Sequence, residues 1–157
     1  MGDVIRRAVV VLALLATATG QARAARVVDD TGAIVELTSP ARRIVTLAPH
    51  AAELVAAAGA ASRLVGVIAT TDMPASTRAL PVVGDANAID VERILALEPD
   101  LVVAWPWSSP AQVARLADRG IPVFTTAPRT IDAIASGIER LGALAGTTPE
   151  ATRAARA

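Results

Sequence analysis

The chain has 157 residues, with fifteen acidic and fifteen basic residues, and every basic residue is arginine. Because these arginines are scattered along the sequence, the composition argues against a nucleic-acid-binding surface. Cysteine is absent, which excludes disulfides, thiolate catalysis and cysteine-ligated metals.

The first 24 residues have the pattern of a secretory signal peptide. Two arginines precede an apolar run over residues 8–16, and Ala22 and Ala24 form an A-x-A cleavage site. The apolar run is shorter than the roughly 20 residues that a membrane-spanning helix needs. We therefore expect cleavage near Ala24 and export of the rest of the chain to the periplasm.

Short apolar runs then predict a hairpin followed by four strands. The hairpin covers residues 26–37, and the sequence Asp-Asp-Thr-Gly at its centre supplies the turn. The four strands fall near residues 44–47, 64–68, 101–104 and 123–125, and helical patterns separate them. Continuous apolar strands alternating with helices are typical of a parallel sheet covered on both faces. The expected fold is a single α/β lobe, with a mainly parallel four-stranded sheet flanked by helices and preceded by a short hairpin.

The helices between the strands carry recognisable start and stop signals. Pro49 and Gly59 delimit the first helix, Asp90 caps the second, and Ser109-Pro110 opens the third. A longer helix is predicted over residues 130–146. Apolar residues at i, i+3 and i+4 spacing predict that one face of this helix packs on the sheet; they are Ile131, Ile134, Ala135, Ile138, Leu141 and Ala145.

The loops that follow the strands carry most of the chemically distinctive residues. In an open α/β sheet, ligands bind just beyond the carboxyl ends of the strands. Trp105 and Trp107 lie at that position after the third strand, separated by Pro106. We interpret them as a platform for a large apolar ligand, with two alternatives: the indoles cover the end of the sheet, or they contact another protein.

Four further residues are candidates for a site, each with a structural alternative. His50, the only histidine, is either a metal or ligand contact or a structural hydrogen-bonding group at a helix start. Asp72 and Arg129 are loop charges that would touch a polar part of a ligand or remain solvated. Glu92, two residues after the cap Asp90, favours the helix dipole and is also suited to a docking role.

The sequence gives poor support for catalysis. It lacks a glycine-rich phosphate-binding motif, a G-x-S-x-G motif and a second histidine that would complete a metal site. A non-enzymatic protein without a resident metal is therefore favoured. The alternatives are a secreted α/β enzyme that uses His50, Asp72 or Arg129, and an interaction domain in which the two tryptophans contact a protein.

Four segments, in this order, resemble a known family: RRIVTLAPHAAELVAAAG (42–59), LVGVIATTDMP (64–74), VGDANAIDVERILALEPDLVVAW (83–105) and LADRGIPVF (116–124). They are similar to the N-terminal lobe of the substrate-binding proteins of ABC importers for vitamin B12, haem and ferric siderophores. The resemblance implies two lobes joined by a long helix, with the ligand between them. It also implies that Glu92, in the helix VERILAL, docks on the membrane permease.

Members of that family that bind corrinoids are similar at two further places, the Asp72-Met73-Pro74 loop and Trp105 directly after the LVVA strand. Met73 stands where those proteins often have tyrosine. The resemblance implies a monomer without an intrinsic cofactor, whose ligand is a corrinoid (vitamin B12) or else an iron chelate or haem. It further implies that residues 25–148 form the first lobe and that residues 149–157 begin a truncated inter-lobe helix.

Overall fold

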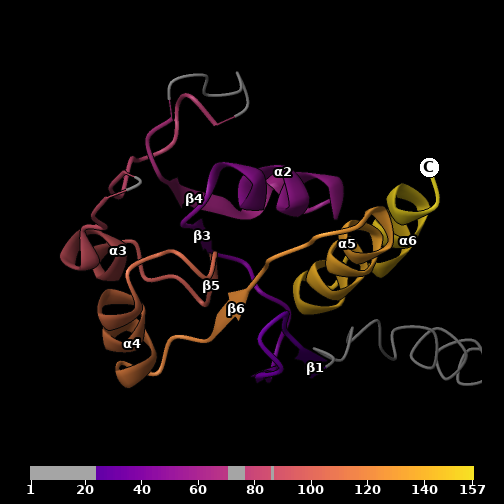
Figure 1. Cartoon of the computed structure of the whole chain (residues 1–157), viewed down its shortest axis with the longest axis horizontal. Coiled ribbons are helices and arrows are strands. Elements are labelled where there is room, and N and C mark those ends of the chain that lie inside the picture. Colours follow the sequence, from indigo (N-terminus) through magenta and orange to yellow (C-terminus); the bar gives the residue numbers. More distant parts are fainter. Residues whose placement is uncertain (1–23, 71–76, 86) are drawn as a thin grey trace, which may run out of the picture.

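Two sheets and the helices around them form the part of the chain that this computed structural model describes, residues 24–70, 77–85 and 87–157 (Figure 1). The first sheet is an antiparallel hairpin of β1 (Ala25–Val28) and β2 (Ile34–Leu37). The hairpin expected over residues 26–37 is therefore confirmed. The predicted signal peptide lies outside the described residues, apart from its last residue.

The second sheet contains four parallel strands in the order β4-β3-β5-β6. They are β3 (Ile44–Thr46), β4 (Leu64–Val67), β5 (Leu101–Ala104) and β6 (Val123–Thr125). After β3, the next strand, β4, is added on one side of β3, whereas β5 and β6 are added on its other side. The direction in which strands are added therefore reverses between β3 and β5. All four carboxyl ends lie on one edge, which confirms the predicted α/β fold and places its topological switch point between β3 and β5.

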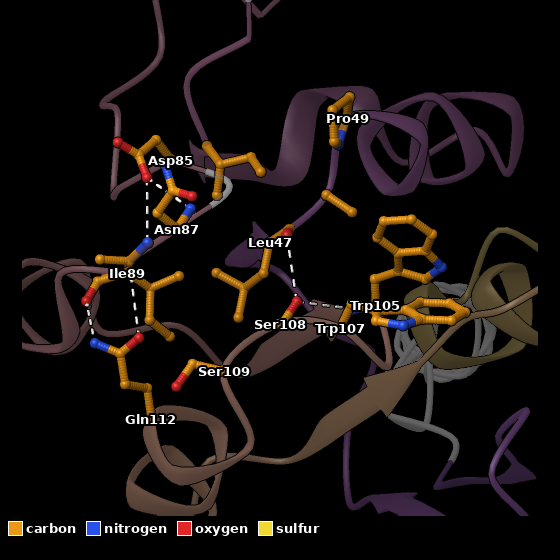
Figure 2. Close-up of a pocket in the computed structure, with 13 residues that line it drawn as sticks. Leu47, Pro49, Asp85, Asn87, Ile89, Trp105, Trp107, Ser108, Ser109 and Gln112 are labelled. Atoms are coloured by element: carbon orange, nitrogen blue, oxygen red, sulfur yellow. Dashed lines mark hydrogen bonds between the residues drawn. The ribbon is translucent and has the colours of Figure 1, made fainter.

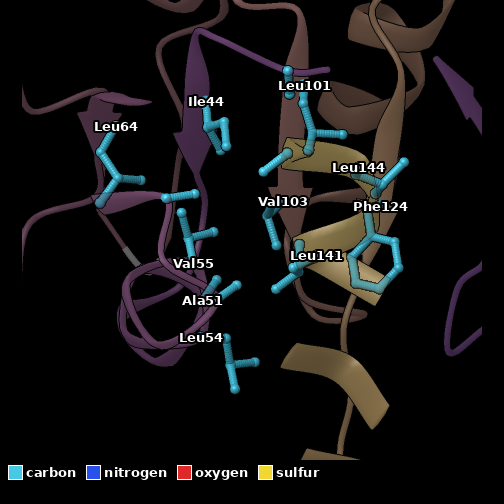
Figure 3. Close-up of a cluster of buried hydrophobic side chains, with 14 of the residues drawn as sticks. Ile44, Ala51, Leu54, Val55, Leu64, Leu101, Val103, Phe124, Leu141 and Leu144 are labelled. Carbon is cyan, nitrogen blue, oxygen red and sulfur yellow. The ribbon is translucent and has the colours of Figure 1, made fainter. Parts of the chain in front are cut away.

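Helices cover both faces of this sheet, each over its own apolar core. On one face, α2 (Pro49–Ala57), α5 (Ile131–Ala145) and α6 (Thr148–Ala155) pack over a cluster that includes Phe124 and Val103, shown in Figure 3. On the other face, α3 (Val91–Ala96) and α4 (Pro110–Asp118) pack over Val45 and Val102. A short 3-10 turn, η1 (Ala61–Arg63), leads into β4. The alternation of side chains along each strand produces these two clusters.

The predicted helix limits agree with the local geometry. Pro49 occupies the first turn of α2, and the Asp90 carboxylate accepts a hydrogen bond from the backbone N–H of Arg93 at 2.9 Å. Thr130 caps α5 in the same way, accepting from the N–H of Ala133 at 3.1 Å. Gly146 ends α5 with φ of +69°, a conformation that favours glycine.

One part of the α5 prediction is wrong. Ile131 and Ile134 were expected on the packed face, but they are 84% and 41% exposed, whereas Ile138 and Leu141 are buried. The periodicity correctly identifies one face, but the core covers that face only from about the second turn onward. The first turn of α5 therefore extends beyond the apolar core.

The last helix, α6, packs closely on α5. A Cβ placed on Gly142 of α5 would overlap the Cβ of Ala151 of α6, so this contact needs glycine. The Thr147 hydroxyl donates to the carbonyl oxygen of Ala58 at 2.6 Å, which joins the start of α6 to the end of α2. The assignment of residues 149–157 to an inter-lobe helix stays a prediction. Across residues 24–70, 77–85 and 87–157, no helix has both the length and the apolar character needed to cross a membrane.

Candidate ligand-binding site

A pocket of about 170 Å³ opens at the carboxyl edge of the sheet, at the switch point between β3 and β5 (Figure 2). The loop after β3 supplies Leu47, Ala48 and Pro49, and the loop after β5 supplies Trp105, Trp107 and Ser108. The described residues that complete the lining are Ile68, Asp85, Asn87, Ala88, Ile89, Ser109 and Gln112. The site thus lies where parallel α/β sheets bind ligands.

A tight turn brings the two tryptophans together. The backbone N–H of Ser108 donates to the carbonyl oxygen of Trp105 at 2.8 Å, which closes a four-residue turn with Pro106 at its second position. Proline is favoured there because its fixed φ matches the turn. The indole centroids are 4.6 Å apart with ring planes inclined at 57°, and the side chains are 40% and 66% exposed. Trp105 and Trp107 therefore form one aromatic surface that faces solvent.

Ser108 joins this turn to the loop after β3. Its hydroxyl accepts a hydrogen bond from the N–H of Trp105 at 3.2 Å and donates to the carbonyl oxygen of Leu47 at 3.4 Å, as Figure 2 shows. These contacts link the two loops on either side of the switch point. Sequence analysis did not single out Ser108, although a serine two residues after Trp-Pro is a recognisable turn signal.

The opposite wall is held by Gln112 of α4. Its side-chain amide donates to the carbonyl oxygen of Ile89 at 2.8 Å and accepts from the N–H of Ile89 at 3.2 Å. Because both hydrogen bonds involve Ile89, they hold the segment that leads into α3 against α4. No local pattern marks this contact, since Ile89 and Gln112 are 23 positions apart.

Asp85 gives the pocket its negative rim. The Asp85 carboxylate accepts hydrogen bonds from the backbone N–H groups of Asn87 at 2.8 Å and Ala88 at 3.1 Å. These bonds lower the pKa of Asp85 below its usual value, so the group is ionised at neutral pH. Asp85 was not among the predicted site residues, although Asp and Asn close together, as in Asp85–Asn87, are a common turn signal.

His50 contacts the aromatic surface but is not one of the residues that line the pocket. Its ring meets the Trp105 indole edge-on, with centroids 5.2 Å apart and planes inclined at 78°. Burial lowers the pKa of His50, while the nearby Glu53 and a hydrogen bond with the Thr126 backbone act in the opposite direction. The imidazole is therefore neutral at neutral pH. A direct contact between His50 and a ligand stays a prediction.

Among the remaining candidates, Arg129 and Glu92 can be located, and both lie outside the pocket lining. Arg129 is exposed in the loop after β6 and is not among the lining residues, while Asp72 and Met73 lie outside the described residues. Glu92 lies in the first turn of α3, with its side chain 75% exposed and one carboxylate oxygen 3.4 Å from Nη2 of Arg115. In the described part of the chain, no group of three or more His, Asp or Glu side chains could hold a metal ion.

A parallel α/β lobe with an aromatic pocket at its switch point is an arrangement that many ligand-binding proteins share. The chain belongs to the periplasmic binding protein family, whose model matches residues 44–156. This is a family of substrate-binding proteins that are not enzymes, which confirms the expectation that the chain is non-catalytic.

Relatives and solved structures agree with this assignment. The chain is 41% identical over 103 residues to the vitamin B12-binding protein of Vibrio campbellii, a match that covers 65% of this chain and 38% of that protein. It is similar to the structure of the periplasmic vitamin B12-binding protein BtuF of Vibrio cholerae, with 37% identity and a TM-score of 0.70 over 74% of this chain and 46% of the other. A periplasmic haem-binding protein from Pseudomonas aeruginosa matches with 30% identity and a TM-score of 0.68, over 74% and 42%. The chain thus spans less than half the length of these proteins.

Proposed function

We propose that this chain is a substrate-binding component of an ABC importer and that it binds a corrinoid against Trp105 and Trp107. The observation that carries the proposal is the pair of adjacent, exposed indoles at the switch point of the sheet. Indoles provide a large apolar surface for stacking, and a protein rarely leaves two of them in solvent without a binding role.

The size of the pocket favours a ligand that lies largely outside it. A volume of about 170 Å³ is small beside the roughly 300–1,000 Å³ of pockets that enclose a small molecule. The exposed indoles instead extend the binding surface beyond the pocket. This arrangement suits a broad, rigid ring system that covers the tryptophans and inserts only one edge or substituent between Ile89 and Trp105.

The charge of the lining favours a corrinoid over haem. The described residues of the pocket include the ionised Asp85 but no arginine or histidine. The periphery of a corrinoid carries neutral amides, which Asn87 is suited to meet, because an amide side chain both donates and accepts hydrogen bonds. Haem carries two propionate carboxylates, which Asp85 would repel. Haem or another iron chelate is therefore the second candidate.

Glu92 is proposed as the contact with the permease. It lies on α3, its carboxylate is exposed, and its interaction with Arg115 is a surface ion pair at 3.4 Å. Exposed pairs of this kind are weak, so an arginine of a partner can displace or share the carboxylate at little cost. Export to the periplasm, where such a permease is accessible, agrees with the predicted signal peptide and with the periplasmic relatives.

Calorimetric titration with cyanocobalamin and with haemin tests the ligand. The wild-type chain should bind cyanocobalamin, and Trp105→Ala should weaken that binding about tenfold or more. Ile131→Ala, which removes an exposed apolar side chain of α5, is the matched control and should bind like the wild type. If a folded sample binds neither compound, ligand binding by this chain is rejected, and an interaction domain becomes the better explanation of the two indoles.

Uptake of labelled cyanocobalamin by cells that depend on this protein tests the docking role. Glu92→Ala should reduce uptake while leaving the calorimetric affinity unchanged, since Glu92 lies outside the pocket. Asp118→Ala, which removes another exposed carboxylate from α4, should change neither quantity. Normal uptake by the Glu92 variant would reject this contact.

A further inference from the structure

Trp105 separates His50 from the pocket. The imidazole and indole centroids are 5.2 Å apart, yet His50 is absent from the pocket lining, which includes the two preceding residues, Ala48 and Pro49. Trp105 therefore has a ring neighbour within the pocket lining, Trp107, and a ring neighbour outside that lining, His50.

Among the described residues, one nitrogen of the His50 ring has no hydrogen bond to hold it. Its Nε2 atom is buried and has no hydrogen-bond partner within the described part of the chain. The hydroxyl of Thr126, whose backbone is hydrogen-bonded to the imidazole, is likewise buried and without a partner there. The imidazole is half-buried, and its polar contacts are a hydrogen bond with the Thr126 backbone and the charge of Glu53. Its well-defined aromatic neighbour is Trp105.

We infer that His50 is a positioning residue for Trp105: the imidazole supports the indole edge-on and holds it beside Trp107 as the wall of the pocket. Edge-to-face geometry at this separation is a favourable arrangement for two aromatic rings. Without the imidazole, Trp105 would be free to turn away from Trp107. The consequence for the indole pair does not depend on any ligand, whereas the consequence for affinity rests on the proposed function.

Protonation should weaken this support. Partial burial disfavours the charged imidazole, so acid should move the ring toward solvent and weaken its contact with Trp105. The charged group that acts on the imidazole is Glu53 of the same helix, and it favours the protonated form. The elements packed against α2 carry further charged residues: Arg63 on η1, Asp132, Glu139 and Arg140 on α5, and Glu150 and Arg153 on α6.

Circular dichroism of the indole pair tests the inference without a ligand. Two indoles 4.6 Å apart produce an exciton couplet whose size depends on their mutual orientation. His50→Ala should reduce the couplet while the helical signal is kept, and His50→Phe should restore it, because phenylalanine can make the same edge contact. Lowering the pH should reduce the couplet in the wild type but not in His50→Phe. Glu53→Ala should move this transition to lower pH, since it removes the group that favours protonation.

Affinity for cyanocobalamin gives a second measurement. It should fall about two- to tenfold in His50→Ala and recover in His50→Phe. A couplet unchanged by His50→Ala would overturn the inference, and so would loss of the couplet in both folded variants. A haemin complex whose spectrum changes equally in both variants would instead make His50 a direct iron ligand and would also overturn it. If the wild type binds no ligand, the proposed function fails, but the couplet still tests the role of His50.

Discussion

The two edges of the parallel sheet differ in how completely their polar groups are satisfied. At the amino edge, the Asp100 carboxylate accepts hydrogen bonds from the backbone N–H groups of Arg42 at 2.8 Å and Arg43 at 2.9 Å. The Arg43 guanidinium donates through Nε to the carbonyl oxygen of Leu97 at 2.9 Å, at the end of α3. At the carboxyl edge, in contrast, the hydroxyls of Thr46 and Thr126 are buried without partners among the described residues.

The aromatic side chains show the same difference. Trp105 and Trp107 both lie at the carboxyl edge with much of their surface in solvent. A protein keeps unsatisfied hydroxyls and exposed indoles only where function or stability elsewhere compensates for them. This difference agrees with a stabilising role for the amino edge and with the proposed binding of a ligand at the carboxyl edge.

The largest expected change in stability comes from a substitution at the amino edge. Asp100→Ala removes the acceptor of two backbone N–H groups and should lower the free energy of unfolding by about 2 kcal/mol. Urea unfolding measures this change, with Asp118→Ala as a control in which an exposed carboxylate is lost. Ligand affinity, measured on the folded fraction, should not change. A stable Asp100→Ala variant with impaired binding would reverse the roles assigned to the two edges.

A smaller effect of opposite sign is expected at the carboxyl edge. Thr126→Val replaces a buried hydroxyl that has no partner in the described structure with a methyl group of similar size. Removing an unsatisfied buried hydroxyl should raise the free energy of unfolding by about 1 kcal/mol. Chemical denaturation of Thr126→Val, which loses the hydroxyl, and of Thr126→Ser, which keeps it, separates the effect of the hydroxyl on stability from the effect of side-chain shape. Destabilisation by valine but not by serine would show that the hydroxyl is satisfied and would remove this contrast between the edges.

The smallest effect concerns the rim charge of the pocket. Backbone hydrogen bonds from Asn87 and Ala88 lower the pKa of Asp85. The stability that these bonds contribute is therefore fully present above the ordinary pKa of aspartate, and it is lost as the pH falls through the lowered pKa of the folded protein. NMR titration of the Asp85 carboxyl measures this value directly. Asp85→Asn should increase haemin affinity relative to cyanocobalamin affinity, because it removes the charge that opposes propionates. An unchanged ratio of haemin affinity to cyanocobalamin affinity would show that Asp85 does not discriminate between the two ligands.

Local signals made most of the fold predictable. Each strand was marked by a short apolar run, and the caps at Asp90 and Thr130 involve residues three positions apart. The carboxyl-edge location of Trp105 followed from the strand before it. These features depend on neighbours in the sequence, which pattern and turn chemistry describe well.

Contacts between distant segments were not predictable in the same way. The pairing of Gln112 with Ile89 and the contact of His50 with Trp105 depend on how α4 and α2 pack on the sheet. The exposure of Ile131 has the same origin, since periodicity identifies a face but not the turn at which the core begins. Tertiary packing decides each of these details, and a single sequence does not display it.

The Trp105–Ser108 turn also affects the entropy of binding. Its closing hydrogen bond and the ring of Pro106 restrict the backbone before any ligand arrives, and Ser108 fixes the turn to the neighbouring loop. A preorganised surface loses little conformational freedom when it becomes covered, so more of the contact energy appears as affinity. An open aromatic wall can thus hold a rigid ligand with few contacts. Loosening the backbone at Pro106 should weaken binding even if both indoles remain.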